Sequence, residues 1–440
     1  MNDRPVKVLQ FGEGNFLRCF IDWMVQRMND SAGFDGLVQI VQPIGDELSP
    51  PSKILNSRGG AYHTCLRGFV DGHKVEQIEE IHSVKGILNA KSDWAAVEDV
   101  VRNTPSIRFV VSNTTEAGIE YKKDADTFPR KVALILKARM EAGLPGFVFI
   151  PCELIEHNGD TLKKCVLQYV ADWGDSALAE WIEKECVFCS TLVDRIVAGR
   201  PDEESAARYA EQLGERDDVL VCGEPFHFFV IEVPKSATDA GFDLESEFPL
   251  KKAGVNVVYT PDMQPYRTRK VRFLNGAHTA TVLEGHLAGF TFVHELVADK
   301  RFNDFFRQIL FEEIFPTVKL PVEERLAYAE SVLERFANPF ANHRLLSICL
   351  NSVSKWKVRV LPTILDYFKL KGFLPKGLVG SMASLIKFYR TDAVNDSPEV
   401  MAYFKAKPSV DDILRKSDFW GMDLTTIPGF ADMVKSSLGK

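Results

Sequence analysis

The chain has 440 residues, of which 45% are hydrophobic and 26% charged, a balance typical of a globular protein. This length exceeds one ordinary hydrophobic core, so we expect two domains, at 1–240 and 241–440. The net charge of -8 argues against nucleic acid or an anionic membrane as the main partner. No signal peptide or apolar run of membrane-spanning length is visible, and eight scattered cysteines favour a reducing cytoplasm.

The first predicted elements follow the order strand, glycine turn, helix. Residues 6–11 form an apolar strand pattern, Gly12 and Gly14 come next, and a helical pattern follows. A Rossmann-type dinucleotide fold needs this order, because the glycines let a pyrophosphate approach the backbone at the helix N-terminus. Leu17 replaces the third glycine of the usual fingerprint, so the pattern alone is equally compatible with a plain tight turn.

A second predicted strand, 37–42, should end near the adenosine ribose of a dinucleotide. The acidic residue usual at that point is replaced by Gln42, and no lysine or arginine follows before Lys53. A 2′-phosphate would need such a cation, so the pattern favours NAD over NADP. Residues 47–60, rich in proline, serine and glycine, are predicted to form a loop.

Strand and helix patterns then alternate up to about residue 240. A hairpin is predicted around Asp71-Gly72, and further elements are predicted at 93–101 (helix), 107–111 (strand), 129–141 (helix), 146–150 (strand), 160–173 (helix) and 222–232 (strand). Polar residues follow the strand at 107–111, where an open α/β sheet has its ligand crevice. Thr114 or Thr115 could instead cap a helix.

Three further residues in this half have a packing interpretation. Cys186 and Cys189 form a lone CxxC without a second ligand pair, so we expect packing residues and no metal site. His227 lies in an apolar strand pattern, where a histidine is usually a satisfied core residue, and it remains a weak substrate candidate.

The segment 269–278 is where we expect the chemistry. No proline follows until Pro316, so the pattern predicts one long helix, in which a turn of roughly 100° per residue spreads Lys270, Asn275 and His278 over one broad face. Gly276 lies among them, although a mid-helix glycine costs about 1 kcal/mol against alanine, which suggests a close approach to the backbone. A solvated basic helix is the alternative.

The spacing Lys270-x-x-x-x-Asn275-x-x-His278 resembles the signature of the mannitol dehydrogenase family of long-chain polyol and sugar-acid dehydrogenases. The stretches 112–118 and 188–197 are similar to its tagaturonate-reducing branch. The resemblance implies an N-terminal Rossmann-like α/β domain and a mostly α-helical C-terminal domain, with the active site between them. It also implies that Lys270 is the general acid/base and that Asn275 and His278 polarise the carbonyl, which needs a lysine pKa lowered toward neutrality.

The resemblance also assigns binding residues. Arg18 is expected near phosphate, and Ser190 stands where polyol-oxidising relatives have an asparagine. The substrate residues implied are Ser190, Lys235 and Lys355. The cofactor residues implied are Gln10, Phe11, Gly12, Glu13, Gly14, Asn15, Phe16, Arg18, Asn113, Thr114 and Glu116.

The implied activity is the NAD-dependent, reversible reduction of D-tagaturonate to D-altronate, a step of hexuronate breakdown. The alternatives are fructuronate or mannonate, an uncharged polyol such as mannitol, or a cofactor-binding regulator without turnover. An intact lysine, asparagine and histidine set speaks against the regulator, because a sensor needs no acid/base. The expected partner is a small sugar acid, with no obligatory protein partner; Lys235, Arg267, Arg269, Arg272, Lys355 and Arg359 are the cations that could attract its carboxylate.

Overall fold

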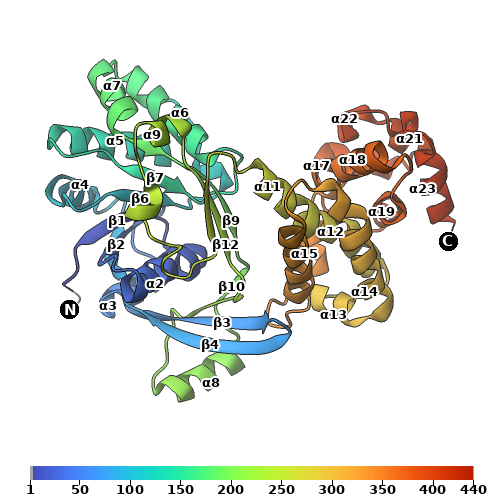
Figure 1. Cartoon of the computed structure of the whole chain (residues 1–440), viewed down its shortest axis with the longest axis horizontal. Coiled ribbons are helices and arrows are strands. Elements are labelled where there is room, and N and C mark those ends of the chain that lie inside the picture. The colour runs from blue at the N-terminus through green and yellow to red at the C-terminus, as the bar shows by residue number, and fades with distance from the viewer. Residues whose placement is uncertain (1–2, 440) are drawn as a thin grey trace. The chain divides into compact units, whose positions relative to one another are not determined.

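A computed structural model describes residues 3–439, in two compact units (Figure 1). Unit 1 holds the residues up to Arg67 and Lys74–Met263, and unit 2 holds Gly68–His73 and the residues from Gln264 onward. The division therefore follows Met263, later than the expected boundary at 240. The reason is that β13 (Val257–Thr260) pairs in parallel with β12 (Phe228–Glu232), which keeps the intervening segment in unit 1.

The main sheet of unit 1 is parallel throughout, with the strand order β5-β2-β1-β6-β7-β8. This is the order of a Rossmann fold, whose ligand crevice lies where the connections reverse direction, here between β1 and β6. The predicted Rossmann-like domain is thus confirmed. Its strands are β1 (Val6–Phe11), β2 (Leu37–Gln42), β5 (Val84–Asn89), β6 (Phe109–Ser112), β7 (Val148–Pro151) and β8 (Val187–Phe188).

Helices cover both faces of this sheet, because alternate strand residues point to opposite sides. Leu9 and Phe11 join one apolar core, and Val8 joins the other. The helical segments of unit 1 are α1 (Asn15–Leu17), η1 (Arg18–Asp22), α2 (Trp23–Ser31), α3 (Pro50–Ser57), α4 (Trp94–Asn103), η2 (Glu116–Gly118), α5 (Phe128–Glu141), α6 (Asn158–Asp172), α7 (Ser176–Glu185), α8 (Glu203–Leu213), α9 (Lys235–Asp239) and α10 (Leu244–Glu247).

Two smaller sheets lie in unit 1, except that Gly68–His73, the turn region of one hairpin, belongs to unit 2. The predicted hairpin is present as β3 (Tyr62–Val70) and β4 (His73–Ile81), turning through Asp71 and Gly72 with positive φ at both. It belongs to the order β10-β11-β3-β4, with β10 (Val197–Gly199) and β11 (Val221–Gly223). The third sheet has the order β13-β12-β9, with β9 at Ser190–Asp194.

Some local predictions were wrong. The predicted loop at 47–60 contains α3, because Ser49 caps its N-terminus and Pro50 fits the first helical position. The predicted strand at 222–232 is two strands of different sheets, β11 and β12. Helix α6 begins at Asn158, two residues before the predicted start at 160, and is preceded by His157 in a left-handed conformation.

Unit 2 is mostly helical, as predicted. Periodicity in the sequence predicts helices near 281–289, 300–313, 321–336, 342–354, 358–370 and 376–389. Helices α14 to α19 lie close to these ranges, with the predicted helix at 342–354 split in two. Its segments are α11 (Gln264–Lys270), η3 (Val271–Gly276), α12 (Ala277–Leu287), α13 (Val293–Ala298), α14 (Lys300–Arg307), η4 (Gln308–Ile314), η5 (Phe315–Thr317), α15 (Val322–Phe336), α16 (Leu345–Cys349), α17 (Ser352–Arg359), α18 (Leu361–Lys371), α19 (Lys376–Phe388), α20 (Pro398–Lys405), α21 (Val410–Arg415), α22 (Ser417–Trp420), η6 (Leu424–Thr426) and α23 (Phe430–Leu438). Among residues 3–439, no helix is long and apolar enough to cross a membrane.

Candidate active site

The glycine turn after β1 has the geometry of a dinucleotide loop. Gly12 has φ +124°, and a Cβ there would lie 3.0 Å from the carbonyl oxygen of Asn113, so a side chain is excluded. Gly14 is different, because a Cβ at that position would meet no atom within 4 Å. The open space lies beside the N-terminus of α1, where backbone N–H groups attract phosphate. The loop therefore fits the pyrophosphate of a dinucleotide.

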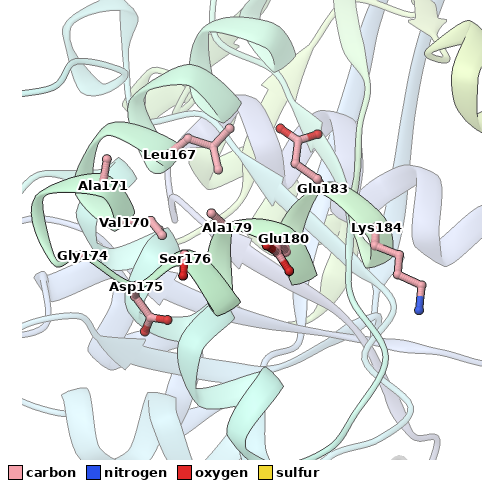
Figure 2. A pocket seen from close by; sticks show the side chains of 10 residues that line it. All are labelled: Leu167, Val170, Ala171, Gly174, Asp175, Ser176, Ala179, Glu180, Glu183 and Lys184. Carbon is pink, nitrogen blue, oxygen red and sulfur yellow. The ribbon is translucent and has the colours of Figure 1, made fainter.

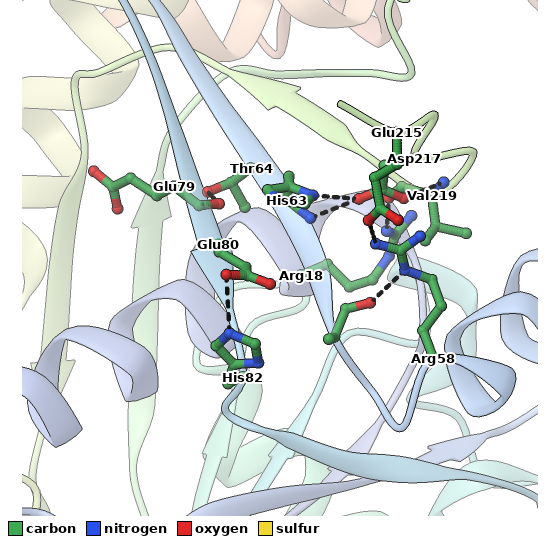
Figure 3. A network of polar contacts seen from close by, with 11 residues as sticks. Arg18, Arg58, His63, Thr64, Glu79, Glu80, His82, Glu215, Asp217 and Val219 are labelled. Carbon is green, nitrogen blue, oxygen red and sulfur yellow. Dashed lines mark hydrogen bonds and ion pairs between the residues drawn. The ribbon is translucent and has the colours of Figure 1, made fainter. Parts of the chain in front are cut away.

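The Arg18 side chain holds this loop in place through hydrogen bonds. Its guanidinium is 3% exposed and donates to the carbonyl oxygens of Glu13 (3.2 Å) and Val219 (2.5 Å) and to the side chain of Asn15 (2.7 Å). Figure 3 shows that Val219 belongs to a wider network, in which Asp217 accepts hydrogen bonds from the His63 and Val219 backbones. The sequence predicts Arg18 near phosphate, and in the structure its guanidinium supports the loop proposed to hold the phosphate.

The aromatic and amide side chains of the predicted cofactor segment also point into the protein. The Gln10 amide is buried and donates to the Gly12 carbonyl oxygen at 3.1 Å. Phe11 is buried against Phe128, and Phe16 stacks on Phe20 with ring centroids 5.0 Å apart. These residues shape the loop, so its backbone is the part best placed to contact a cofactor.

The polar residues after β6 are held by a carboxylate that the sequence did not single out. Glu153, 2% exposed, accepts hydrogen bonds from the Thr114 backbone and hydroxyl (2.9 and 3.0 Å) and from the Ser112 hydroxyl (3.1 Å). Burial raises the pKa of Glu153, and these hydrogen bonds partly oppose that effect. The Asn113 backbone N–H bonds to the Phe11 carbonyl, which brings this segment to the glycine loop. The side chain of Glu116 lies outside the described part of the structure.

Of the predicted substrate residues in unit 1, Ser190 is buried and Lys235 is exposed. The Ser190 hydroxyl accepts a hydrogen bond from the Gly159 backbone at 3.2 Å, at the N-terminus of α6. A Cβ on Gly159 would lie 2.2 Å from the Cys189 carbonyl oxygen, so glycine permits this approach. The Lys235 ammonium lies 2.6 Å from the carboxylate of Asp239, one helical turn on. A carboxylate of the substrate would have to compete with that ion pair.

The packing interpretations agree with the structure. His227 donates through Nδ1 to the Pro225 carbonyl (3.1 Å) and accepts at Nε2 from the Asn256 backbone (3.0 Å), so it is a satisfied, neutral histidine. Burial lowers its pKa to about 4. Cys186 and Cys189 are buried free thiols in the apolar cores, and burial raises the pKa of each to about 12.

A surface pocket between α6 and α7 has a lining that suits neither phosphate nor a sugar acid (Figure 2). Apolar side chains such as Leu167 and Val170 line it together with the carboxylates of Asp175, Glu180 and Glu183. Its ten lining residues include none of the predicted site residues. The candidate cofactor-binding residues are therefore those of the glycine loop in unit 1, and the candidate catalytic residues are those of the helix in unit 2 described next.

Lys270, Asn275 and His278 lie on one continuous helical segment, α11–η3–α12, which ends at Leu287. The regular α-helix that we predicted is interrupted, because residues 271–276 form a π-helix. Hydrogen bonds in a π-helix join residues five apart, so each turn holds more residues than a turn of an α-helix. The side chains of Lys270 and Asn275 therefore point in more similar directions than they would in an α-helix. Single π turns inside α-helices occur frequently at functional sites.

Gly276 permits the close approach that its position suggested. A Cβ there would lie 3.0 Å from the Arg359 carbonyl oxygen, at the end of α17. The two neighbouring arginines serve packing: Arg269 stacks over Tyr328 at 4.3 Å, and Arg272 donates to the Thr317 carbonyl at 2.8 Å and pairs with Asp366. Neither guanidinium is therefore a first choice for a substrate carboxylate.

His278 is buried and neutral. Burial lowers its pKa well below the usual value, and His343, Arg335 and Arg359 act in the same direction. Its ring stacks on Phe336 with centroids 3.9 Å apart, and its Nε2 atom has no hydrogen-bond partner among the described residues. A buried polar atom without a partner is costly, so Nε2 is suited to a ligand oxygen.

Lys355, the remaining predicted substrate residue, lies in the same region of unit 2 as His278. Its ammonium donates to the Ile348 carbonyl at 2.9 Å, and burial, together with Arg359, lowers its pKa. Lys355 in turn lowers the pKa of His343, whose ring meets His278 edge-on. Lys355 is thus close to His343, and through it to the predicted catalytic histidine, a proximity that the sequence separation of 278 and 355 did not reveal.

Comparisons with known proteins agree with this geometry. Residues 6–242 match the mannitol dehydrogenase Rossmann domain, and 262–440 match the mannitol dehydrogenase C-terminal domain. Altronate oxidoreductase of Bacillus subtilis (strain 168) is 39% identical over 98% of this chain and 91% of its own length. Altronate oxidoreductase of Yersinia enterocolitica is 37% identical over 99% of this chain and 94% of its own length.

Solved structures show the same fold. The Pseudomonas fluorescens mannitol 2-dehydrogenase ternary complex with NAD and D-mannitol has a TM-score of 0.73 at 21% identity, covering 99% of this chain and 92% of that chain. A substrate-free D-sorbitol dehydrogenase has a TM-score of 0.79 at 23% identity, covering 100% and 93%. With both domain models and full-length relatives matched, the chain belongs to the mannitol dehydrogenase family and is an oxidoreductase acting on CH–OH groups.

Proposed function

We propose that the protein interconverts D-tagaturonate and D-altronate with NAD(H). The observation that carries the proposal is the continuous segment α11–η3–α12, which holds Lys270, Asn275 and His278 in a chain whose 37–39% identical relatives are altronate oxidoreductases. A fructuronate or mannitol enzyme of the same family is the alternative. Altronate and tagaturonate are favoured because the similarity extends over 98–99% of this chain.

The cofactor proposal rests on unit 1. The open space at Gly14 and the excluded side chain at Gly12 fit a pyrophosphate, and NAD(H) supplies or accepts the hydride when bound. At the end of β2, the Gln42 amide is used within its own loop, on the carbonyls of Ile44 and Glu47. The lysines beside that loop are paired, Lys53 with Glu47 at 3.0 Å and Lys91 with Asp46, which supports NAD over NADP.

In the direction of reduction, Lys270 donates a proton to the carbonyl oxygen of the keto acid as hydride reaches its carbon. Asn275 donates a hydrogen bond to that oxygen and orients it. His278 stays neutral because of its lowered pKa, so its Nε2 acts as a hydrogen-bond donor and leaves proton transfer to Lys270. In oxidation, the neutral amine of Lys270 accepts the hydroxyl proton.

A substrate panel tests this proposal. Oxidation of NADH by the purified enzyme is measured with D-tagaturonate, D-fructuronate and D-fructose, and reduction of NAD with D-altronate and D-mannitol. We expect the highest kcat/KM for tagaturonate and altronate. A higher kcat/KM for fructuronate or for either neutral sugar would overturn the substrate assignment, and a preference for NADPH would overturn the cofactor assignment.

A further inference from the structure

A group of basic side chains surrounds His278 in unit 2. His343 meets the His278 ring edge-on, with centroids 5.3 Å apart. Lys355 acts electrostatically on His343, while Arg335 and Arg359 act on His278. We call these five residues the basic cluster; they come from α12, α15, α17 and the segment just before α16.

Each positive charge in the basic cluster disfavours protonation of its neighbours. Burial and Lys355 lower the pKa of His343, and burial and Arg359 lower that of Lys355. Asp396 is the carboxylate that acts on Lys355 in the opposite direction. That carboxylate accepts hydrogen bonds from the Tyr389 hydroxyl and from the Val353 and Ser397 backbones, so it is committed to local structure. The cluster therefore has the electrostatic character of an anion site.

Within the cluster, His343 has the side chain best suited to respond to an anion. The Lys355 ammonium is anchored on the Ile348 carbonyl, and the His278 Nε2 is the donor that we assign to the reacting oxygen. His343 lies beside both residues. Its main-chain carbonyl oxygen accepts a hydrogen bond from the Val293 backbone N–H. Histidine is also the side chain whose charge changes most readily near neutral pH.

We propose that His343 binds the carboxylate of the sugar acid. When the acid binds, the His343 imidazole takes up a proton from solvent and donates an N–H hydrogen bond to the carboxylate, beside Lys355. This inference rests on the proposed function, because it requires an anionic substrate. No bond to carbon changes and no electron moves; one proton passes from water to imidazole on binding and returns on release. Binding of the acid should therefore weaken as pH rises, whereas binding of a neutral ketose should not.

The test uses the full-length enzyme and three variants. His343→Gln removes the titration, His343→Lys keeps a cation that does not titrate near neutral pH, and His73→Gln changes an exposed histidine as a control. For each, kcat/KM is measured between pH 6 and pH 9 on tagaturonate and on fructose. Proton uptake on altronate binding to the enzyme with NADH, a combination that cannot turn over, is measured by calorimetry in two buffers of different ionisation enthalpy.

We expect wild type and His73→Gln to take up part of a proton near pH 7.5, and both His343 variants to take up almost none. In His343→Gln, the ratio of kcat/KM for tagaturonate to that for fructose should fall about 10–150-fold, the range for a lost hydrogen bond to a charged group. His343→Lys should keep most of that ratio and lose its pH dependence.

Unchanged proton uptake or an unchanged substrate ratio in His343→Gln would overturn the role of His343 while leaving the proposed function intact. A wild-type enzyme that reduces fructose but no uronate would overturn both. If His343→Gln does not fold, as judged by circular dichroism, the wild-type proton count and His343→Lys decide the question, because absence of proton uptake in wild type contradicts the inference directly.

Discussion

At the scale of single residues, some polar side chains of the site are held by contacts within the protein, and others keep an atom that a ligand could contact. Arg269 and Arg272 are engaged by Tyr328, Thr317 and Asp366, so their charges serve the helix packing. His278 Nε2 has no partner among the described residues. Chemistry is therefore expected from Lys270 and its immediate neighbours on the segment α11–η3–α12.

Lys270→Ala should lower turnover about 10²–10⁴-fold, because it removes the proton donor from the transition state. The dissociation constant for NADH should stay near the wild-type value, since the glycine loop is untouched. Turnover is measured by NADH oxidation at saturating keto acid, and NADH affinity by fluorescence titration. Lys371→Ala, which removes an exposed lysine at the end of α18, is the matched control. Near-wild-type turnover of a folded Lys270→Ala enzyme would refute the assignment.

At the scale of elements, the two glycines of the β1–α1 turn have different roles. Gly12 is required by the backbone conformation, and Gly14 leaves space for a ligand. Gly12→Ala must place a Cβ at φ +124° and 3.0 Å from the Asn113 carbonyl, whereas Gly14→Ala has ordinary φ and open space. We expect Gly12→Ala to reduce the free energy of unfolding by about 1–3 kcal/mol, the usual cost of such a conformation. Gly14→Ala should leave stability unchanged and weaken NADH binding, because the methyl group occupies the space proposed for the pyrophosphate.

Thermal unfolding and NADH titration of the two variants check this contrast. Equal stability of Gly12→Ala and wild type would show that the loop can relax, and unchanged NADH affinity in Gly14→Ala would place the pyrophosphate elsewhere. The opposite behaviour of two glycines only two positions apart makes each the control for the other.

At the scale of the whole molecule, buried neutral histidines make the fold sensitive to acid. The pKa of His227 is lowered to about 4 by burial and by Arg195, against an ordinary value near 6.5. Between these values the unfolded chain binds more protons than the folded one. Stability therefore falls as pH falls from about 6.5 to about 4, and the contribution of His227 is fully present above pH 6.5.

His227→Gln should reduce this sensitivity, because a glutamine amide can donate to Pro225 and accept from Asn256 without titrating. The loss of melting temperature between pH 7 and pH 5 should be smaller in His227→Gln than in wild type and in the exposed control His82→Gln, whose side chain is 50% exposed. Since the chain has two compact units, melting is followed by calorimetry, which resolves separate transitions. An identical pH dependence in wild type and His227→Gln would contradict the prediction.

The sequence by itself determined the features that local signals encode. The strand, glycine turn and helix around Gly12, the hairpin turn at Asp71-Gly72 and the helices of unit 2 follow from periodicity and turn residues within short windows. Lys270, Asn275 and His278 could be grouped in advance because they are near neighbours in the chain. The family resemblance was confirmed by both domain matches and by full-length relatives.

Only the tertiary structure decided which distant residues meet. Arg18 supports the glycine loop through Val219, which lies 201 positions away, and Glu153 holds Thr114 from the next strand. His343 meets His278 from the segment just before α16, and Lys355 acts on His343 from α17. Arg359 approaches Gly276 beside a π-helical turn that α-helical periodicity could not predict. The physical reason is that helix and turn signals arise between neighbours in the chain, whereas these contacts depend on how complete elements pack.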